Sequence, residues 1–129
     1  MNPRPDALFR AFATQEERRA FGGSAFVELQ VCRLPSGTPL KKIMDVCSLS
    51  HWRSDSLYVH DEDLELFDRE YGRLFGCGAV DLFGVNYCAP SSLEATQDAI
   101  RASKPPDFET LLRWLDNAKV YNGFYILGI

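Results

Sequence analysis

The chain has 129 residues, of which 46% are hydrophobic and 25% are charged, and its formal net charge is −4. This composition is typical of a globular protein and excludes an intrinsically disordered chain. No apolar run approaches the ~18 residues of a membrane-spanning helix, and the length suits one domain over residues 1–129.

The beginning of the chain shows no export signal. Arg10 interrupts the first apolar residues, so the uninterrupted apolar stretch of a secretory signal peptide is missing. We therefore expect a cytoplasmic location, in which the four cysteines are reduced thiols. Cys32 and Cys88 lie in strand-like segments and are expected to be small buried side chains.

Residues 5–21 predict two short helices. Three apolar side chains fall on one side of the first helix: Leu8, Phe9 and Phe12. Thr14 and Glu17 have the spacing of a capping box, in which each side chain accepts a backbone N–H, so a second helix is expected to begin there. Gly22 and Gly23 end that helix.

Residues 24–34 alternate between apolar and polar side chains. The apolar positions are Val27, Leu29 and Val31. Glu28 and Gln30 point to the opposite face, so the pattern predicts a strand with one buried and one exposed face.

Residues 38–49 are compatible with a helix or with a strand. The turn over residues 35–37 would place a returning strand in a hairpin. Thr38 followed by Pro39 instead resembles a helix N-cap and first helical position. Both structures stay open, and a shared helical face favours the helix. That face comprises Leu40, Ile43, Met44 and Cys47.

The middle of the chain predicts a strand and then a helix. Residues 56–59 form the short strand. Residues 60–76 have the clearest helical pattern in the chain, with acids crowded into the first turn, where the helix dipole favours negative charge. The apolar stripe of this helix comprises Leu64, Phe67, Tyr71, Leu74 and Phe75.

A further strand and helix follow. Residues 79–87 predict the strand, and residues 91–103 predict the helix. Ser91 or Ser92 is expected to cap this helix, and Glu94 is placed for a capping box.

Residues 108–119 predict the last helix. Asp107 is expected to cap it, and Trp114, beside its apolar side, is expected in the core. The inward side chains are Phe108, Leu111, Leu112 and Leu115.

Residues 124–129 are apolar on both faces of a predicted strand, which indicates a strand in the interior of its sheet. The expected fold class is therefore α+β. It is a single compact domain whose small, mainly antiparallel sheet is packed by three to five helices, with the C-terminal strand interior to the sheet.

Charge is unevenly distributed along the chain. Residues 1–53 contain eight Lys/Arg and five Asp/Glu, a net of +3, and residues 54–129 contain six and thirteen, a net of −7. Seven of these acids lie between Asp55 and Glu70. The balance argues against binding to nucleic acid or to anionic lipid, and it permits a basic protein partner.

Two groups of side chains offer ligands for a metal. The first comprises Cys47, His51, Cys77 and Cys88, but the chain lacks the closely spaced pairs of structural zinc sites, so buried thiols and a loop histidine are favoured. The second is the run from His60 to Asp63, for which a solvated first turn of a helix is the simpler interpretation. We expect no metal and no cofactor.

The leading functional hypothesis is a small acidic cytosolic protein-binding module. Its most concrete version is an immunity-type inhibitor that occludes a basic partner such as a nuclease-like toxin. No P-loop, G-x-S-x-G or H-E-x-x-H pattern is present, so an enzyme is disfavoured. Two alternatives stay open: a metal-dependent enzyme that uses the His60–Asp63 cluster, and a regulatory or scaffold domain. The oligomeric state stays open too. The expected partner-binding residues are Trp52, Arg53, Asp55, Asp61, Glu62, Asp63 and Glu65.

Overall fold

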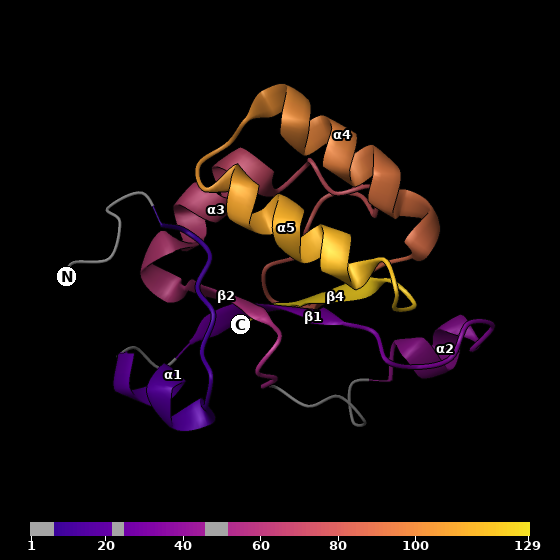
Figure 1. Cartoon of the computed structure of the whole chain (residues 1–129), viewed down its shortest axis with the longest axis horizontal. Helices are drawn as coiled ribbons and strands as arrows, with labels where there is room; N and C mark the ends of the chain where they lie inside the picture. Colours follow the sequence, from indigo (N-terminus) through magenta and orange to yellow (C-terminus); the bar gives the residue numbers. More distant parts are fainter. Residues whose placement is uncertain (1–6, 22–24, 46–51) are drawn as a thin grey trace.

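The computed structural model describes residues 7–21, 25–45 and 52–129, and its fold is α+β, as predicted (Figure 1). In chain order the elements are α1 (Gln15–Phe21), β1 (Phe26–Val31), α2 (Leu40–Ile43), β2 (Leu57–His60), the 3-10 helix η2 (Asp61–Asp63), α3 (Leu64–Tyr71), β3 (Val85–Cys88), the 3-10 helix η3 (Pro90–Ser92), α4 (Leu93–Ser103), α5 (Phe108–Ala118) and β4 (Phe124–Leu127). Within the described ranges, no helix has the length and apolar character needed to cross a bilayer.

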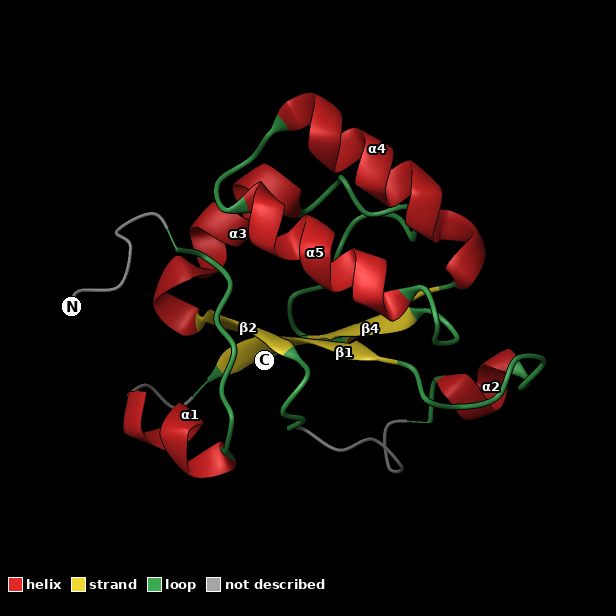
Figure 2. Ribbon diagram, in the orientation of Figure 1, coloured by secondary structure: helices red, strands yellow, loops and turns green. Residues whose placement is uncertain are grey.

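The four strands form one antiparallel sheet in the order β2-β1-β4-β3 (Figure 2). β4 pairs with β1 on one side and with β3 on the other, so Leu127 lies opposite both Glu28 and Val85. All four residues of β4 are buried. The predicted interior position of the C-terminal strand is therefore confirmed.

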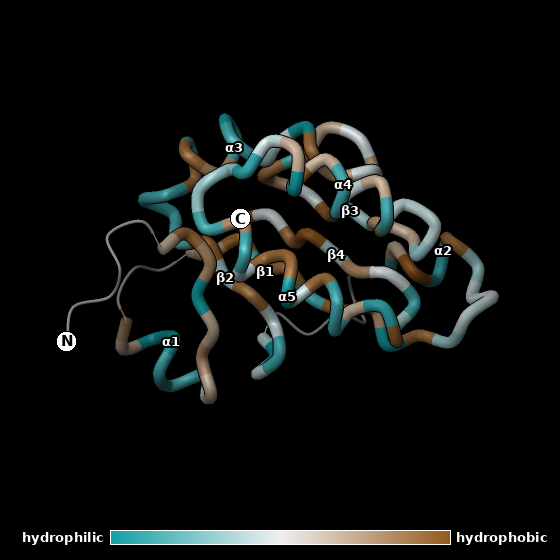
Figure 3. Tube along the Cα trace, turned by 45° about the horizontal axis from the view of Figure 1, so that its top comes forward, coloured by the Kyte–Doolittle hydropathy of each residue, from teal (hydrophilic) through white to brown (hydrophobic). Residues whose placement is uncertain are grey.

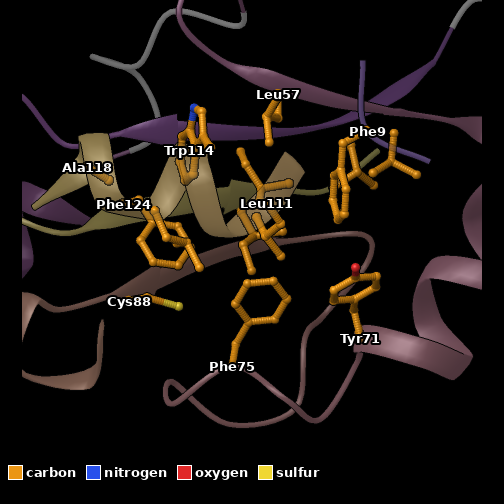
Figure 4. Close-up of a cluster of buried hydrophobic side chains, with 14 of the residues drawn as sticks. Phe9, Leu57, Tyr71, Phe75, Cys88, Leu111, Trp114, Ala118 and Phe124 are labelled. Atoms are coloured by element: carbon orange, nitrogen blue, oxygen red, sulfur yellow. The ribbon is translucent and has the colours of Figure 1, made fainter. Parts of the chain in front are cut away.

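Helices α3, α4 and α5 cover one face of the sheet (Figure 1). On this face the ring of Phe124 in β4 meets Phe75, which follows α3, at 6.0 Å and Trp114 of α5 at 5.5 Å between centroids (Figure 4). The Trp114 indole N–H donates to the carbonyl of Asp55 at 2.7 Å. Trp114 is thus a core residue, as predicted, and its one polar atom is satisfied.

The opposite face of the sheet is also buried, which corrects the half-buried strand predicted for β1. Glu28 and Gln30 are only 4% and 3% exposed. Helices α1 and α2 lie on this side (Figure 1), and Tyr125 of β4 donates its hydroxyl to the carbonyl of Ile43 in α2 at 2.7 Å. β1 and β4, which contain strongly hydrophobic stretches (Figure 3), are thus buried on both faces.

The segment before α1 is extended, so the helix predicted over its apolar residues is wrong. The backbone N–H groups of Leu8 and Phe9 donate to Oδ2 of Asp107 at 3.0 and 2.9 Å. Arg10 exchanges two backbone hydrogen bonds with Tyr58 of β2, at 2.9 and 2.8 Å. Distant partners therefore satisfy the groups that a helix would have paired locally.

The second helix of this region begins where the capping box predicted it. Glu17 N–H donates to Oγ1 of Thr14 at 3.1 Å, and the Glu17 carboxylate accepts from Ala13 N–H at 3.1 Å. For residues 38–49, the structure contains the short helix α2, and residues 46–49 lie outside the described residues.

Ser92 and Asp107 stand at the N-cap positions of α4 and α5, as predicted, but neither side chain makes the expected capping bond. The Ser92 hydroxyl donates to the carbonyl of Ala89 at 2.7 Å and makes no capping bond to α4. Asp107 precedes α5 with a φ of 60° and makes no capping bond to that helix. Its carboxylate instead accepts from the N-terminal segment and, at Oδ1, from the Thr110 hydroxyl at 2.6 Å.

The helix and strand predicted over residues 60–76 and 79–87 are shorter in the structure. The helix divides into η2 and α3, and its predicted stripe points into the core, with Phe67 and Tyr71 fully buried. The strand is reduced to β3, because a turn precedes it, in which the Gly84 N–H donates to the carbonyl of Asp81 at 3.3 Å.

Cys77 and Cys88 form a disulfide, which corrects the expectation of reduced thiols. Their Cα atoms are 4.9 Å apart, and the bond ties the segment after α3 to the end of β3. Cys32 is a free, fully buried thiol, as predicted. Cys47 lies outside the described residues.

Replacing Ile126 by alanine should lower the free energy of unfolding by about 2–5 kcal/mol, because it leaves a cavity in a strand buried on both faces. Urea denaturation measures the loss. The matched control is Val120→Ala, at a side chain that is 84% exposed, which should change stability by less than about 0.5 kcal/mol. Equal stabilities for the two variants would contradict the interior position of β4.

Removing the disulfide with the double change C77A/C88A should lower the free energy of unfolding by about 3 kcal/mol, because the cross-link closes a short loop in the unfolded chain. Denaturation with and without a thiol reductant measures this. The reductant should destabilise the original chain and leave the double variant unchanged. A reductant that leaves both unchanged would show that the bond is not formed.

Candidate functional site

Four acids gather where the chain leaves β2 and enters α3: Asp61, Glu62, Asp63 and Glu65. We refer to these four side chains as the acidic corner. Asp61, Glu62 and Glu65 are exposed, and Asp63 is partly exposed. The sequence placed them together in one helical turn, and the structure confirms that grouping across η2 and the start of α3.

His60, the last residue of β2, holds the acidic corner in place. Its Nδ1 atom accepts the backbone N–H of Glu62 at 3.1 Å, and so caps η2. The N–H of Asp61 donates to the carbonyl of Ala25, just before β1, at 3.2 Å. The corner is therefore fixed to the sheet by its backbone, and Oδ1 of Asp61 also lies 3.0 Å from Nδ1 of His60.

An exposed aromatic ring lies beside the acidic corner. Phe21, at the end of α1, is 41% exposed, and its ring packs edge-on against His60 at 5.5 Å between centroids. The guanidinium of Arg10 lies over the same ring at 4.4 Å from its centroid. Sequence reasoning missed Phe21; its only signal was a large apolar residue next to the glycines that end the helix.

The other predicted binding residues lie apart from the acidic corner. Trp52, Arg53 and Asp55 precede β2, whereas the corner follows it, and the four residues of β2 span about 10 Å. Trp52 is half-buried. The backbone N–H of Arg53 donates to the Tyr58 hydroxyl at 2.9 Å.

Asp55 makes two contacts within the fold, one through its side chain and one through its backbone. Its carboxylate pairs with Arg33, and its carbonyl accepts from Trp114. The structure thus divides the predicted set into the acidic corner and a separate group that anchors the start of β2. A binding role for that separate group stays a prediction.

The described residues line three cavities whose walls are known, and the acidic corner is part of none of those walls. Three such cavities have volumes of about 420, 390 and 420 Å³. None of these three is lined by His60 or by the acidic corner. An enzyme site would place its acids in such a hollow, whereas an acidic surface that contacts a protein need not.

The described residues contain no group of three or more His, Cys, Asp or Glu side chains arranged to hold a metal ion. Of the ligand types considered from the sequence, Cys77 and Cys88 are bonded to each other, and Cys47 and His51 lie outside the described residues. The geometry therefore offers the metal-dependent alternative no support in this part of the chain.

A buried carboxylate forms a second polar cluster, on the face of the sheet that α1 and α2 share. Oε2 of Glu28 accepts from Gln30 Nε2 at 3.0 Å, from the Ser56 hydroxyl at 2.7 Å and from the Tyr58 hydroxyl at 3.3 Å. All four side chains are less than 5% exposed, so a substrate has no access to them. The cluster joins the residues before β2 to β1.

No family model, no curated protein and no solved structure matches the chain. The acidic corner and the ring of Phe21 beside it are the surface that the geometry favours for function.

Desolvation by burial raises the pKa of Glu28 above its ordinary value of 4.5, and the hydrogen bonds from Gln30, Ser56 and Tyr58 only partly oppose the rise. The folded chain then binds this proton more tightly than the unfolded chain does. The stability that Glu28 contributes is complete below pH 4.5 and is lost as the pH rises through the raised pKa.

Replacing Glu28 by glutamine removes this titration. The unfolding free energy of the original chain, relative to E28Q, should therefore fall as the pH increases from about 4 to about 8. Urea denaturation across this range measures it. E109Q, which neutralises an exposed carboxylate on α5, corrects for the change in net charge. A difference that stays constant with pH would contradict the raised pKa.

Proposed function

We propose that this protein is a small protein-binding module that recognises a basic partner through the acidic corner, most concretely an immunity-type inhibitor that occludes a nuclease-like toxin. The observation that carries the proposal is the exposure of the carboxylates of Asp61, Glu62 and Glu65 on one turn that lines none of the three cavities. An acidic protein surface can occupy the positions of phosphates on a nuclease and block its site.

Charge supports the same partner chemistry. Residues 54–129 have a net charge of −7, and the acidic corner lies within them. Clustered charge of one sign raises the rate at which an oppositely charged partner arrives, and this steering weakens as salt screens the charges. A basic partner therefore gains most from this surface in the rate of association.

Phe21 supplies the apolar surface that the carboxylates lack. Interfaces depend on a few large side chains that lose water on binding, and aromatic rings are frequent among them. With 41% of its surface exposed beside His60, Phe21 can be covered by a partner that also meets Asp61 and Glu62. Arg10 already stacks on this ring, which holds it against the sheet.

The regulatory or scaffold alternative has no observation of its own in its favour. The metal-dependent enzyme would need the His60 imidazole free to bind a cation together with nearby carboxylates. Instead, Nδ1 of His60 accepts a backbone N–H, and the ring is covered by Phe21 and Phe26. The protein-binding function is therefore the one that the geometry favours.

Neutralising the acidic corner with D61N/E62Q/D63N should slow association with a partner captured by the full chain. The on-rate should fall by about ten-fold at low salt, with a smaller loss at high salt, because steering depends on charge. Stopped-flow or surface-based kinetics over a salt series measure the on-rate and the off-rate separately.

The matched control is E16Q/E94Q/E109Q, which makes the same change in net charge at exposed acids of α1, α4 and α5. Its on-rate should stay close to that of the unchanged chain. Equal losses for the two triple variants, or rates that ignore salt, would rule out recognition by the acidic corner.

A further inference from the structure

We propose that this chain forms a symmetric dimer through the outer edge of β3, which pairs antiparallel with the same edge of a second copy. The four-stranded sheet then continues into one of eight strands, in the order β2-β1-β4-β3-β3-β4-β1-β2. This edge lies at the opposite side of the sheet from β2 and the acidic corner. The dimer is therefore independent of the function proposed above.

The hydrogen bonds to β4 determine which backbone groups of β3 face outward. Gly128 N–H donates to the carbonyl of Gly84 at 2.8 Å, and Asn86 lies two residues further along the same register. Hydrogen-bonded pairs recur at every second residue of an antiparallel ladder. Asn86 therefore directs its backbone groups toward β4, and its neighbours Val85 and Tyr87 direct theirs away from the sheet.

These outward groups of β3 have no partner within the described part of the chain. None of the described residues makes a hydrogen bond with the N–H or C=O group of Val85 or of Tyr87. The first three residues of β3 are only partly buried, whereas β2 and β4 are buried along their whole length. β3 is thus an open edge, and open edges readily pair with another strand.

The other edge of the sheet is already covered. Arg10 exchanges backbone hydrogen bonds with Tyr58 at 2.9 and 2.8 Å, so the segment before α1 lies against the outer side of β2. Within the described residues, β3 is therefore the edge that is left open. Two copies that each have one open edge form a closed two-fold pair and do not grow into a longer assembly.

The edge also lacks the features that keep edge strands apart. Natural edges are often protected by lysine, by proline or by other charged side chains. β3 has the sequence VNYC, and residues 82–89 contain no charged side chain. Two copies of a chain with a net charge of −4 can therefore meet along this segment without bringing like charges together. A second copy is the occupant that fits, since nothing along the edge selects a charged partner.

A two-fold axis beside Asn86 gives the pairing that uses every outward group of the strand. Val85 of one copy then lies opposite Tyr87 of the second copy, and each such pair exchanges N–H···O=C bonds in both directions. Within one copy, both side chains pack against Tyr125 and Leu127 on the same face of the sheet. Across the joined edges they become cross-strand neighbours, a pairing of β-branched and aromatic side chains that stabilises sheets.

An exposed aromatic ring lies at the start of this edge. Phe83 is 75% exposed, and it belongs to the turn in which Gly84 N–H donates to the carbonyl of Asp81 at 3.3 Å. In the same register, residue 83 comes opposite Ala89 of the second copy. The dimer thus offers Phe83 an apolar neighbour, and large aromatic side chains are frequent anchors of interfaces.

Dimerisation places the two acidic corners at opposite ends of the joined sheet. Neighbouring strands are about 4.8 Å apart, so the two β2 strands are separated by roughly 34 Å across the eight strands. Each dimer then presents two separate surfaces to a basic partner. This consequence rests on the function proposed above, whereas the dimer does not.

Analytical ultracentrifugation of the full chain, from about 10 µM to about 1 mM, tests the dimer. So short an interface is at the weak end of specific contacts, so we expect a monomer–dimer equilibrium within this range. V85K places a charge on the edge and should raise the dissociation constant by at least about ten-fold. The matched control V120K makes the same substitution at a side chain that is 84% exposed and lies outside β3, and it should dimerise like the unchanged chain.

Hydrogen exchange followed by NMR locates the interface without any variant. The amides of Val85 and Tyr87 should exchange about three-fold more slowly at about 1 mM than at about 50 µM, because they are hydrogen-bonded only in the dimer. The amide of Asn86 faces β4 in the monomer as well and should change less. F83S alters an exposed side chain, so it tests the edge even if V85K does not fold, and it should weaken the dimer by about three-fold.

A chain that stays monomeric up to about 1 mM would overturn the proposal, as would a dimer that V85K and V120K form equally well. Assembly beyond two chains would contradict the covered edge of β2. Protection of Val85 and Tyr87 that appears only when the captured basic partner is added would assign the edge to a strand of that partner and overturn the dimer. Absence of the dimer leaves the proposed function intact, and a partner that does not need the acidic corner leaves the dimer intact.

Discussion

β1 and β4 pair antiparallel at the centre of the sheet, and covering both of their faces is the constraint that organises the rest of the molecule. A strand buried on both sides needs a layer on each side. α3, α4 and α5 supply one layer, and α1 and α2 contribute to the other. β2 and β3 then lie at the outer positions of the sheet, and the acidic corner follows β2 directly. The surface proposed to bind a partner therefore follows the strand that pairs with β1, next to the buried central pair of β1 and β4.

Burying the second face of β1 places polar groups in the interior. The carboxylate of Glu28 accepts hydrogen bonds from three side chains. Two of these donors are Ser56, which directly precedes β2, and Tyr58 of β2. An unpaired carboxylate would cost far more than a paired one in this position. The same hydrogen bonds fix the approach to β2, so the electrostatics of the core and the placement of the acidic corner are linked through one short strand.

The acidic corner combines a rigid backbone with outward charges. His60 and the carbonyl of Ala25 hold the turn, and the side chains of Asp61, Glu62 and Glu65 are exposed. Such an arrangement loses little backbone freedom when a partner binds, since the turn is already in place. Phe21 adds apolar surface next to the charges, so steering and contact come from neighbouring but different elements.

Local pattern determined a large part of this protein. The apolar faces of residues 124–129 identified the interior strand, and periodic stripes identified the helices α3 and α5, because burial repeats with the geometry of each element. The grouping of acids at residues 61–65 also followed from the chain itself, since neighbours in one turn stay neighbours in space.

Only the tertiary structure decided the contacts between remote residues. Asp107 accepts N–H groups from residues 98 and 99 positions away, so it holds the N-terminal segment extended where periodicity had predicted a helix. The disulfide between Cys77 and Cys88 and the burial of Glu28 also depend on tertiary contacts that the local pattern does not report. Periodicity reports which side of an element is apolar. The packing of the layers around the sheet decides which distant group satisfies a donor or covers a polar face. It also decides that Phe21 is exposed.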